Sequence, residues 1–321
     1  MQEFHGRTLD ALDTASARHD GLIPSGLLAE LGVNSHVARA LVAARELVRV
    51  RRGIYVRAGR WKSADESERY RLFIRASALT AGRPAVLSHL SAAALHGLPT
   101  IGGWPRAVHA LHQGSSGGST ARFTTSHRGV ADPNAVLIGG LAVTSLARTL
   151  IDVAAGTSLL VGVTMIDHAL RARGALTKKD LYAELAAVNP RAGAGQAERA
   201  ISFASPLAEN PGESLSRVRI FQLGFEVPER QVCFSNVKGH DYWVDFYWRG
   251  VRKIGEFDGK LKYTRGQVLG GRDPGEVVYK EKRREEALRF LVGSFDRRDW
   301  DTALSPRLFH GFLTEHGVPR A

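Results

Sequence analysis

The chain has 321 residues, and 44 Lys and Arg against 32 Asp and Glu give it a formal net charge of +12. This length is enough for two or three domains, and an apolar content of 44% supplies sizeable cores. The positive surplus favours a polyanionic partner, either nucleic acid or an anionic membrane surface. A solvated basic surface without such a partner is the alternative.

Cysteine content and hydropathy further limit the classes of protein to which the chain can belong. Cys233 is the only cysteine, which excludes disulfides within the chain and cysteine-based zinc sites and is normal for a reducing cytoplasm. No apolar run reaches the roughly 18 residues needed to span a bilayer. The N-terminus lacks a charged region followed by an apolar one, so neither a signal peptide nor a membrane partner is expected.

The N-terminal segment is predicted to form a winged helix. Helical periodicity marks three short helices at 8–19, 24–31 and 35–46, with Asn34 placed to cap the third. Alternating residues at 47–57 predict two short strands around a glycine-containing turn. In such an arrangement the third helix enters the major groove of DNA and the hairpin lies along phosphates.

Candidate DNA contacts follow from this arrangement, on the outer side of the third helix and on the hairpin. A winged helix used for protein contacts is the alternative. The candidates are His36, Arg39, Arg45, Arg49, Arg51 and Arg52.

The middle segment, 61–190, is predicted to be a separate α+β region, with helices at 61–78 and 84–95 among others. His89 and His96 are seven residues apart and share one helical face. Two further ligands are not evident, so both histidines are expected to be structural or surface residues rather than metal ligands.

Near the C-terminal end, a stretch rich in aromatic and acidic residues predicts a β-hairpin with Arg249–Gly250 as its turn. With that turn, Asp245 faces Ile254, and Glu256 lies diagonally from Asp245 at roughly 7–8 Å. Because side chains alternate along a strand, Asp258 shares the same face.

Three carboxylates on one sheet face repel one another, and a divalent cation would compensate them. Mg²⁺ prefers oxygen ligands and takes one or two carboxylates with waters and phosphate; Mn²⁺ is the alternative ion. Lys260 and Lys262 would hold a phosphate or orient a water, as metal-assisted phosphodiester hydrolysis requires. The alternative is a solvated face whose acids pair with Arg252 and Lys253. The expected metal ligands are Asp245, Glu256 and Asp258.

Elements around the hairpin follow the order helix, strand, hairpin, helix, strand, which is that of restriction-endonuclease-like α/β folds. Glu213 opens the first helix, at 213–223, where its charge suits the helix macrodipole. The second helix, at 277–290, is crowded with basic residues. Such a run is usually a solvated face, but beside an acidic metal site it would track a DNA backbone. The candidates there are Lys280, Arg283 and Arg284.

Two family resemblances accompany these patterns. Residues 8–60 resemble the winged-helix domain of AbiEi-type antitoxins, the transcription-regulating half of type IV toxin–antitoxin systems. The wing at 52–55, Arg-Gly-Ile-Tyr, carries the resemblance, and 88–99 and 141–152 are similar to segments that follow it. The resemblance implies a transcriptional regulator or phage-defence factor, with a cognate toxin as protein partner.

Residues 210–300 are similar to the very-short-patch-repair-endonuclease-like domain of the PD-(D/E)XK superfamily. The matching motifs are 213–217 (Glu-Ser-Leu-Ser-Arg), 244–246 (Val-Asp-Phe) and 256–259 (Glu-Phe-Asp-Gly). Their order along the chain carries the resemblance, which implies a metal-dependent endodeoxyribonuclease fold.

Carried over to this chain, the resemblance makes Asp245 the central metal ligand, Glu256 or Asp258 the second ligand, and Glu213 an accessory acid. In one register Lys260 is the superfamily's lysine; the register that uses Glu256 and Asp258 excludes it. Lys262 stands where the family often has histidine. A lysine binds phosphate but is a poorer general base near neutral pH.

The sequence therefore predicts a multidomain α+β protein of the cytoplasm that binds DNA. Its C-terminal domain would be Mg²⁺-dependent and nuclease-like. The alternative is a non-catalytic repressor or antitoxin that neutralises a toxin by protein contact, with its nuclease fold inactive. The expected domains are an N-terminal winged helix-turn-helix at 1–60, a middle α+β domain at 61–190, and a restriction-endonuclease-like α/β domain at 200–321.

Overall fold

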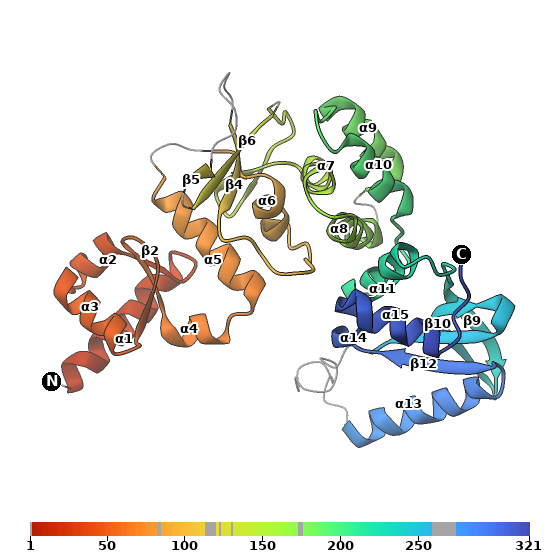
Figure 1. The fold of residues 1–321 in the computed structure, drawn as a ribbon. Coiled ribbons are helices and arrows are strands. Elements are labelled where there is room, and N and C mark those ends of the chain that lie inside the picture. Colours follow the sequence, from red (N-terminus) through yellow and green to blue (C-terminus); the bar gives the residue numbers. More distant parts are fainter. Residues whose placement is uncertain are drawn as a thin grey trace. The chain divides into compact units, whose positions relative to one another are not determined.

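A computed structural model describes residues 2–81, 85–112, 120–121, 123–129, 131–172, 176–258 and 274–321. The protein is mixed α+β and divides into two compact units, which are described separately below (Figure 1). Unit 1 contains residues 1–153 and 188–190, and unit 2 contains residues 154–187 and 191–321. None of the described helices is both long and apolar enough to cross a bilayer.

The N-terminal part of unit 1 is a helical cluster against a small sheet of order β1-β3-β2. Its core is apolar, with Leu12, Ile23 and Leu41 buried together. The elements are α1 (Gln2–Ala17), β1 (Leu22–Pro24), α2 (Ser25–Glu30), α3 (Ser35–Ala43), β2 (Leu47–Arg51) and β3 (Ile54–Arg57).

The sequence prediction for α3 is confirmed at its start and corrected at its end. The Asn34 side chain accepts hydrogen bonds from the N–H groups of His36 (2.9 Å) and Val37 (3.0 Å), as an N-cap does. The helix ends at Ala43 rather than at residue 46, because Arg45 adopts a left-handed backbone with φ +59°.

The rest of unit 1 packs helices against a sheet of order β4-β6-β5 and a β7-β8 hairpin. Tyr70, Ile74 and Val108 belong to its core. Helix α6 is shorter than predicted and begins at His89, whose φ is +51°. The elements are α4 (Ala58–Ser63), α5 (Glu66–Leu79), α6 (His89–Leu95), β4 (Val108–His112), β5 (Thr120–Ala121), β6 (Thr124–Arg128), β7 (Val136–Ile138), β8 (Leu141–Val143) and α7 (Leu146–Gly156), which runs into unit 2.

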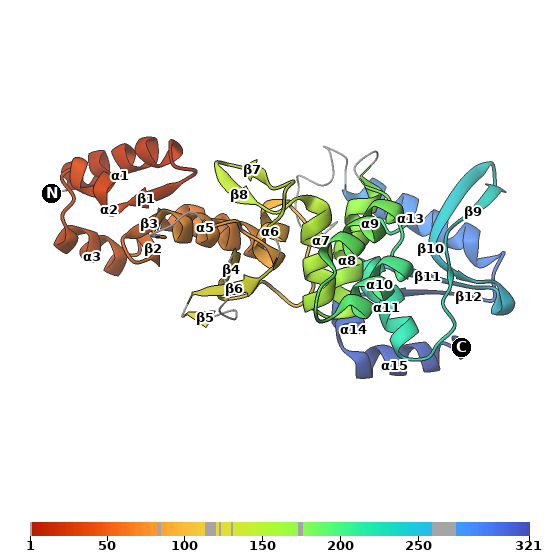
Figure 2. The same cartoon turned by 90° about the horizontal axis from the view of Figure 1, so that it is seen from above.

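Unit 2 is built on a sheet of order β12-β11-β10-β9, in which only β11 and β12 run parallel. Phe246 and Trp248 pack towards α11 and α15, whereas Ile254 and Phe295 pack with Leu288 of α13. The sheet therefore lies between two helical layers (Figures 1 and 2). The elements are α8 (Leu159–Arg171), α9 (Lys178–Val188), α10 (Ala194–Phe203), α11 (Pro211–Gln222), β9 (Glu229–Val237), β10 (His240–Trp248), β11 (Lys253–Phe257), α13 (Pro274–Arg289), β12 (Ser294–Arg298), α14 (Trp300–Leu304) and α15 (Pro306–Glu315).

The turn between β10 and β11 is longer than predicted, and this corrects the strand register. Residues Arg249–Val251 form a 3₁₀ turn, and Arg252 follows in the left-handed region at φ +48°. Trp248 therefore pairs with Lys253, and Phe246 with Gly255. The predicted pairing of Asp245 with Ile254 is therefore wrong, because Ile254 pairs with Tyr247.

Candidate functional site

The candidate centre of unit 2 begins with Glu213 in the first turn of α11. Asn210 caps this helix by accepting from the N–H groups of Gly212 (2.9 Å) and Glu213 (3.1 Å), and Pro211 occupies its first turn. The cap holds the Glu213 carboxyl inside the unit, where the residue is only 5% exposed.

Glu213 accepts hydrogen bonds from the N–H of Glu209 (2.9 Å), Asn210 Nδ2 (2.6 Å) and Gln231 Nε2 (3.4 Å). Burial, and next the negative charge of Asp245, raise the pKa of Glu213 to about 8. The carboxyls of Glu213 and Asp245 therefore lie near enough to interact electrostatically. A carboxyl with such a raised pKa contributes less negative charge to the helix macrodipole, so the role that the sequence suggested for Glu213 is secondary.

Asp245 on β10 is tied to the end of β11, because its Oδ2 accepts from the N–H of Phe257 at 2.8 Å. The Phe257 ring in turn packs on the start of α11. A Cβ built on Gly212 would lie 2.0 Å from that ring. Glycine at 212 therefore allows the close approach that brings α11 and its Glu213 to the carboxylate of Asp245.

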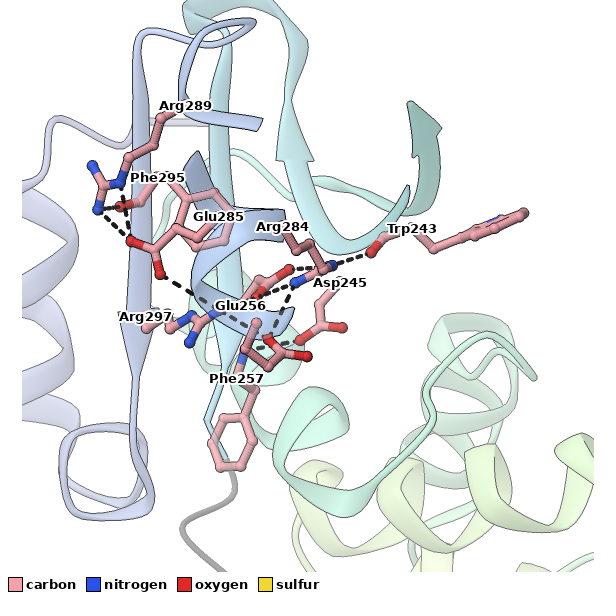
Figure 3. Close-up of polar contacts among 10 residues, drawn as sticks. Trp243, Asp245, Glu256, Phe257, Arg284, Glu285, Arg289, Phe295 and Arg297 are labelled. Atoms are coloured by element: carbon pink, nitrogen blue, oxygen red, sulfur yellow. Dashed lines mark hydrogen bonds and ion pairs between the residues drawn. The ribbon is translucent and has the colours of Figure 1, made fainter. Parts of the chain in front are cut away.

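Glu256 is neutralised by arginines. Arg284 of α13 donates to both carboxylate oxygens, from Nη2 at 2.5 Å and Nη1 at 3.0 Å, and Arg297 Nη2 lies 3.5 Å from Oε2. Arg284 also donates to the carbonyl oxygen of Trp243 at 2.6 Å (Figure 3). The charge compensation that the sequence assigned to a metal ion comes, for Glu256, from two side chains. Arg284, predicted as a DNA contact, is an internal ion-pair partner.

Arg298, at the end of β12, is a member of the centre that sequence reasoning missed. It is 2% exposed, and burial lowers its pKa to about 10 against the opposing charges of Asp245 and Glu213. Its Nε donates to Ser216 Oγ at 2.9 Å, and its guanidinium carbon lies 4.3 Å from the centroid of the Phe246 ring. The predicted last strand ended at residue 295, so no signal pointed to this arginine.

The remainder of the 213–217 motif is structural. Asp167 of α8 accepts hydrogen bonds from Arg217 Nη2 at 2.7 Å and from Ser214 Oγ at 2.7 Å. It also accepts from the N–H of Ser205 at 2.6 Å. All of these groups are buried, so the motif fixes α11 against α8 and thereby orients Glu213.

The other predicted residues of unit 2 lie as follows. Asp258 is half-buried after β11, and its N–H donates to the carbonyl oxygen of Arg298 at 2.8 Å. Lys280 is exposed and pairs with Glu276 at 2.7 Å. Arg283 is also exposed. Lys260 and Lys262 lie outside the described residues.

The carboxylates of this centre meet the requirements of a metal site only in part. Across the described ranges, no group of three or more His, Cys, Asp or Glu is arranged to hold one. Glu256 is engaged by Arg284. Asp245 and Glu213 match the one or two carboxylates with which Mg²⁺ is usually held.

The predicted DNA contacts of unit 1 lie on α3, in the turn after it and on the β2–β3 hairpin. We call the exposed ones the basic surface: His36, Arg39, Arg45, Arg49 and Arg52.

Arg51 differs from the basic surface. Its guanidinium carbon lies 4.4 Å from the centroid of the Phe123 ring and 5.4 Å from that of Phe73, and burial lowers its pKa. Arg51 thus packs inside unit 1 instead of facing a phosphate.

His89, expected to be a structural or surface residue, belongs to a half-buried imidazole cluster in unit 1. Its ring stacks on His127 with centroids 3.5 Å apart, and His109 Nδ1 lies 2.8 Å from His127 Nε2. Burial, and next the neighbouring imidazoles, lower the pKa of His89 to about 2. Asp152 Oδ2 lies 3.8 Å from His89 Nδ1, and Arg148 pairs with Asp152 at 2.9 Å.

No protein-family model matches the chain, and no curated protein matches it significantly.

Proposed function

We propose that the chain is a cytoplasmic DNA-binding protein whose basic surface contacts the duplex. The observation that supports this most directly is a contrast in ion pairing. Within the described part of the chain, none of the four arginines of the basic surface has an ion-pair partner. Five other arginines of unit 1 are paired with Asp or Glu: Arg57, Arg60, Arg71, Arg75 and Arg148.

The geometry of α3 and the hairpin supports a winged-helix mode of binding. A capped helix after a tight turn is suited to the major groove, where His36 and Arg39 would meet base edges or phosphates. Arg49 and Arg52 on the hairpin would lie along the backbone. Exposed guanidinium groups without an ion-pair partner can neutralise phosphates, and so release counterions from the DNA, without first breaking an internal ion pair.

For unit 2 we propose a nuclease-type centre in which Asp245 and Glu213 hold a divalent cation. This keeps Asp245 as the central ligand and exchanges Glu256 for Glu213. When bound, such a cation polarises a phosphoryl oxygen and lowers the pKa of a coordinated water. The three-layer arrangement around β9–β12 and the burial of Glu213 support a restriction-endonuclease-like fold.

A second candidate is a repressor or antitoxin whose nuclease fold is inactive. The grip of Arg284 and Arg297 on Glu256 favours it, because an acid neutralised internally is not available to a metal. Antitoxin-like transcription control or phage defence, with a cognate toxin as partner, is the biological context proposed for either form.

The two candidates are separated by a cleavage assay. Labelled duplex and single-stranded DNA are incubated with the full chain, with and without Mg²⁺ or Mn²⁺. The variants Asp245→Ala and Glu213→Gln are run beside the wild type. Cutting that needs the metal and is lost in both variants supports the nuclease. Binding without cutting in all three proteins supports the inactive form.

A further inference from the structure

Unit 1 contains an open pocket walled by aromatic rings. Its volume is about 480 Å³, within the range typical of small-molecule sites. The rings come from α4, α5, the loop before β4 and the residue before β6. They are Trp61, Tyr70, Phe73, Trp104 and Phe123.

The wall formed by Trp104 is held in place by polar contacts. Trp104 Nε1 donates to Ser67 Oγ at 3.0 Å, and its ring stacks on that of Tyr70 with centroids 5.2 Å apart and an interplanar angle of 14°. The Tyr70 hydroxyl donates to the carbonyl oxygen of Ala107 at 2.9 Å. These contacts leave the indole plane fixed before any ligand arrives.

Trp61 is fixed in a different way. Arg69 of α5 donates from Nε to the carbonyl oxygen of Trp61 at 2.9 Å and from Nη2 to that of Lys62 at 3.3 Å. Its guanidinium carbon lies 5.6 Å from the centroid of the Trp61 ring. Both indoles of unit 1 are thus preorganised at the same pocket.

Core packing accounts for only part of these rings. Phe73 and Trp104 pack on the core cluster of Tyr70 and are otherwise half-exposed, and Phe123 is 37% exposed. Aromatic faces open to a pocket of this size suit a planar ring, since offset stacking adds to the gain from burial.

The charged groups at the pocket indicate what such a ring would carry. Arg106 lines the pocket, is exposed, and has no ion-pair partner among the described residues. It is therefore free to bind a phosphate. Glu66 also lines the pocket and offers a carboxylate that accepts from an amino or ring N–H group.

We propose that this aromatic pocket binds a single nucleotide, with the base stacked on Trp61 or Trp104 and the phosphate at Arg106. The nucleotide is either a free mononucleotide or one unit of a single-stranded nucleic acid. None of the residues that line the pocket belongs to the basic surface, so the proposal does not depend on duplex binding there.

The test is titration of the full chain with the four deoxynucleoside monophosphates and with a short single-stranded oligonucleotide. Quenching of tryptophan fluorescence reports stacking, and calorimetry gives the affinity independently. We expect saturable binding that Trp61→Ala and Arg106→Ala each weaken roughly 5-fold or more, as loss of a stacking or phosphate contact does. Phe290→Ala removes an 81% exposed ring in unit 2 and is the matched control. This variant should bind the nucleotide with the same affinity as the wild type.

The arms of the experiment also identify the source of the nucleotide. Saturation by a monophosphate indicates a free ligand, and saturation by the oligonucleotide alone indicates a single strand. Arg39→Ala, on the basic surface, leaves either result intact. Thermal unfolding confirms that Trp61→Ala is folded, and the exposed Arg106→Ala provides a second variant. No saturable signal with any probe, or binding that survives both substitutions, overturns the proposal.

Discussion

Arg284 holds Glu256 through both carboxylate oxygens, with Nη2 2.5 Å from Oε1 and Nη1 3.0 Å from Oε2. Arg284 comes from α13 and Glu256 from β11, so the pair joins a covering helix to the sheet. Arg297 of β12 adds a third contact at 3.5 Å. Glu256 is 8% exposed, and its charge therefore depends on these partners instead of on solvent.

Replacing Arg284 by alanine is expected to destabilise the protein. Glu256 would keep only Arg297, and a buried carboxylate that loses its bidentate partner costs about 2–4 kcal/mol in the free energy of unfolding. Urea unfolding followed by circular dichroism measures the change. Arg283→Ala, an exposed arginine on the same helix, is the control and should stay within about 0.5 kcal/mol. Equal stability of the two variants would show that the ion pair contributes nothing.

Glu213 should make stability fall as the pH rises. Its pKa is raised to about 8 from the ordinary 4.5, so between these values the folded state binds a proton that the unfolded state has lost. The stabilisation is complete below about pH 4.5 and is lost as the pH rises through 8. Glu213→Gln is expected to flatten this slope, measured by urea unfolding at pH 5, 6, 7 and 8. A slope unchanged in the variant would contradict the assignment.

Metal binding at Glu213 should change the stability of the protein with the opposite pH dependence. A divalent cation binds the ionised carboxyl, so millimolar Mg²⁺ is expected to stabilise the wild type most at pH 8 and least at pH 5. Glu213→Gln and Asp245→Ala should lose this increment. If Mg²⁺ has the same effect on all three proteins at every pH, the acidic pair is not its site.

Gly212 controls the approach of α11 to the Phe257 ring. The methyl group of Gly212→Ala would meet that ring at 2.0 Å, so the ring or the helix must shift. We expect a loss of about 1–3 kcal/mol in stability, and any activity that needs Asp245 should fall with it. Gly195→Ala, on α10 with nothing within 4 Å of the new carbon, is the matched control. It should be neutral or slightly stabilising, because alanine favours a helix interior. A Gly212→Ala protein as stable as Gly195→Ala would refute the close approach.

The imidazole cluster should make unit 1 acid-sensitive. Burial, and next His127, lower the pKa of His109 to about 4, so below pH 6.5 the unfolded state takes up protons that the folded state refuses. Stability is complete above about pH 6.5 and is lost as the pH falls towards 4. Hydrogen exchange of peptides from 86–112 should quicken between pH 6.5 and 5 after correction for the intrinsic rate. His109→Gln should reduce the effect and the exposed His240→Gln should not.

Local signals in the sequence were enough to predict several elements of this fold. Asn34 before an apolar stripe predicted the capped start of α3, and the alternating residues at 47–57 predicted β2 and β3, as observed. Helix α11 was also expected, although it begins at Pro211, two residues earlier than predicted. Helix caps and the alternation of side chains along a strand depend only on residues close together in the chain, and the sequence alone can therefore predict them.

The composition of the acidic centre could not be predicted in the same way. Arg284 binds Glu256, and Arg298 lies within electrostatic reach of Asp245, but both come from elements distant in sequence and no local pattern indicates these partners. The two-residue turn prediction was wrong because Arg252, not a glycine, adopts the left-handed backbone. Arg51 belongs to the same alternating pattern as Arg49, but its guanidinium packs on the ring of Phe123, which is far along the chain.

The central claim is that the basic surface binds DNA, and its most direct test is the salt dependence of duplex binding. Fluorescence anisotropy at several salt concentrations compares the wild type with Arg39→Ala, Arg49→Ala and Arg191→Ala, an exposed arginine of unit 2. Each phosphate contact removed should lower the slope of log K against log salt by about 0.9. The account predicts smaller slopes and weaker binding for Arg39→Ala and Arg49→Ala, with Arg191→Ala like the wild type. Four identical slopes would contradict it.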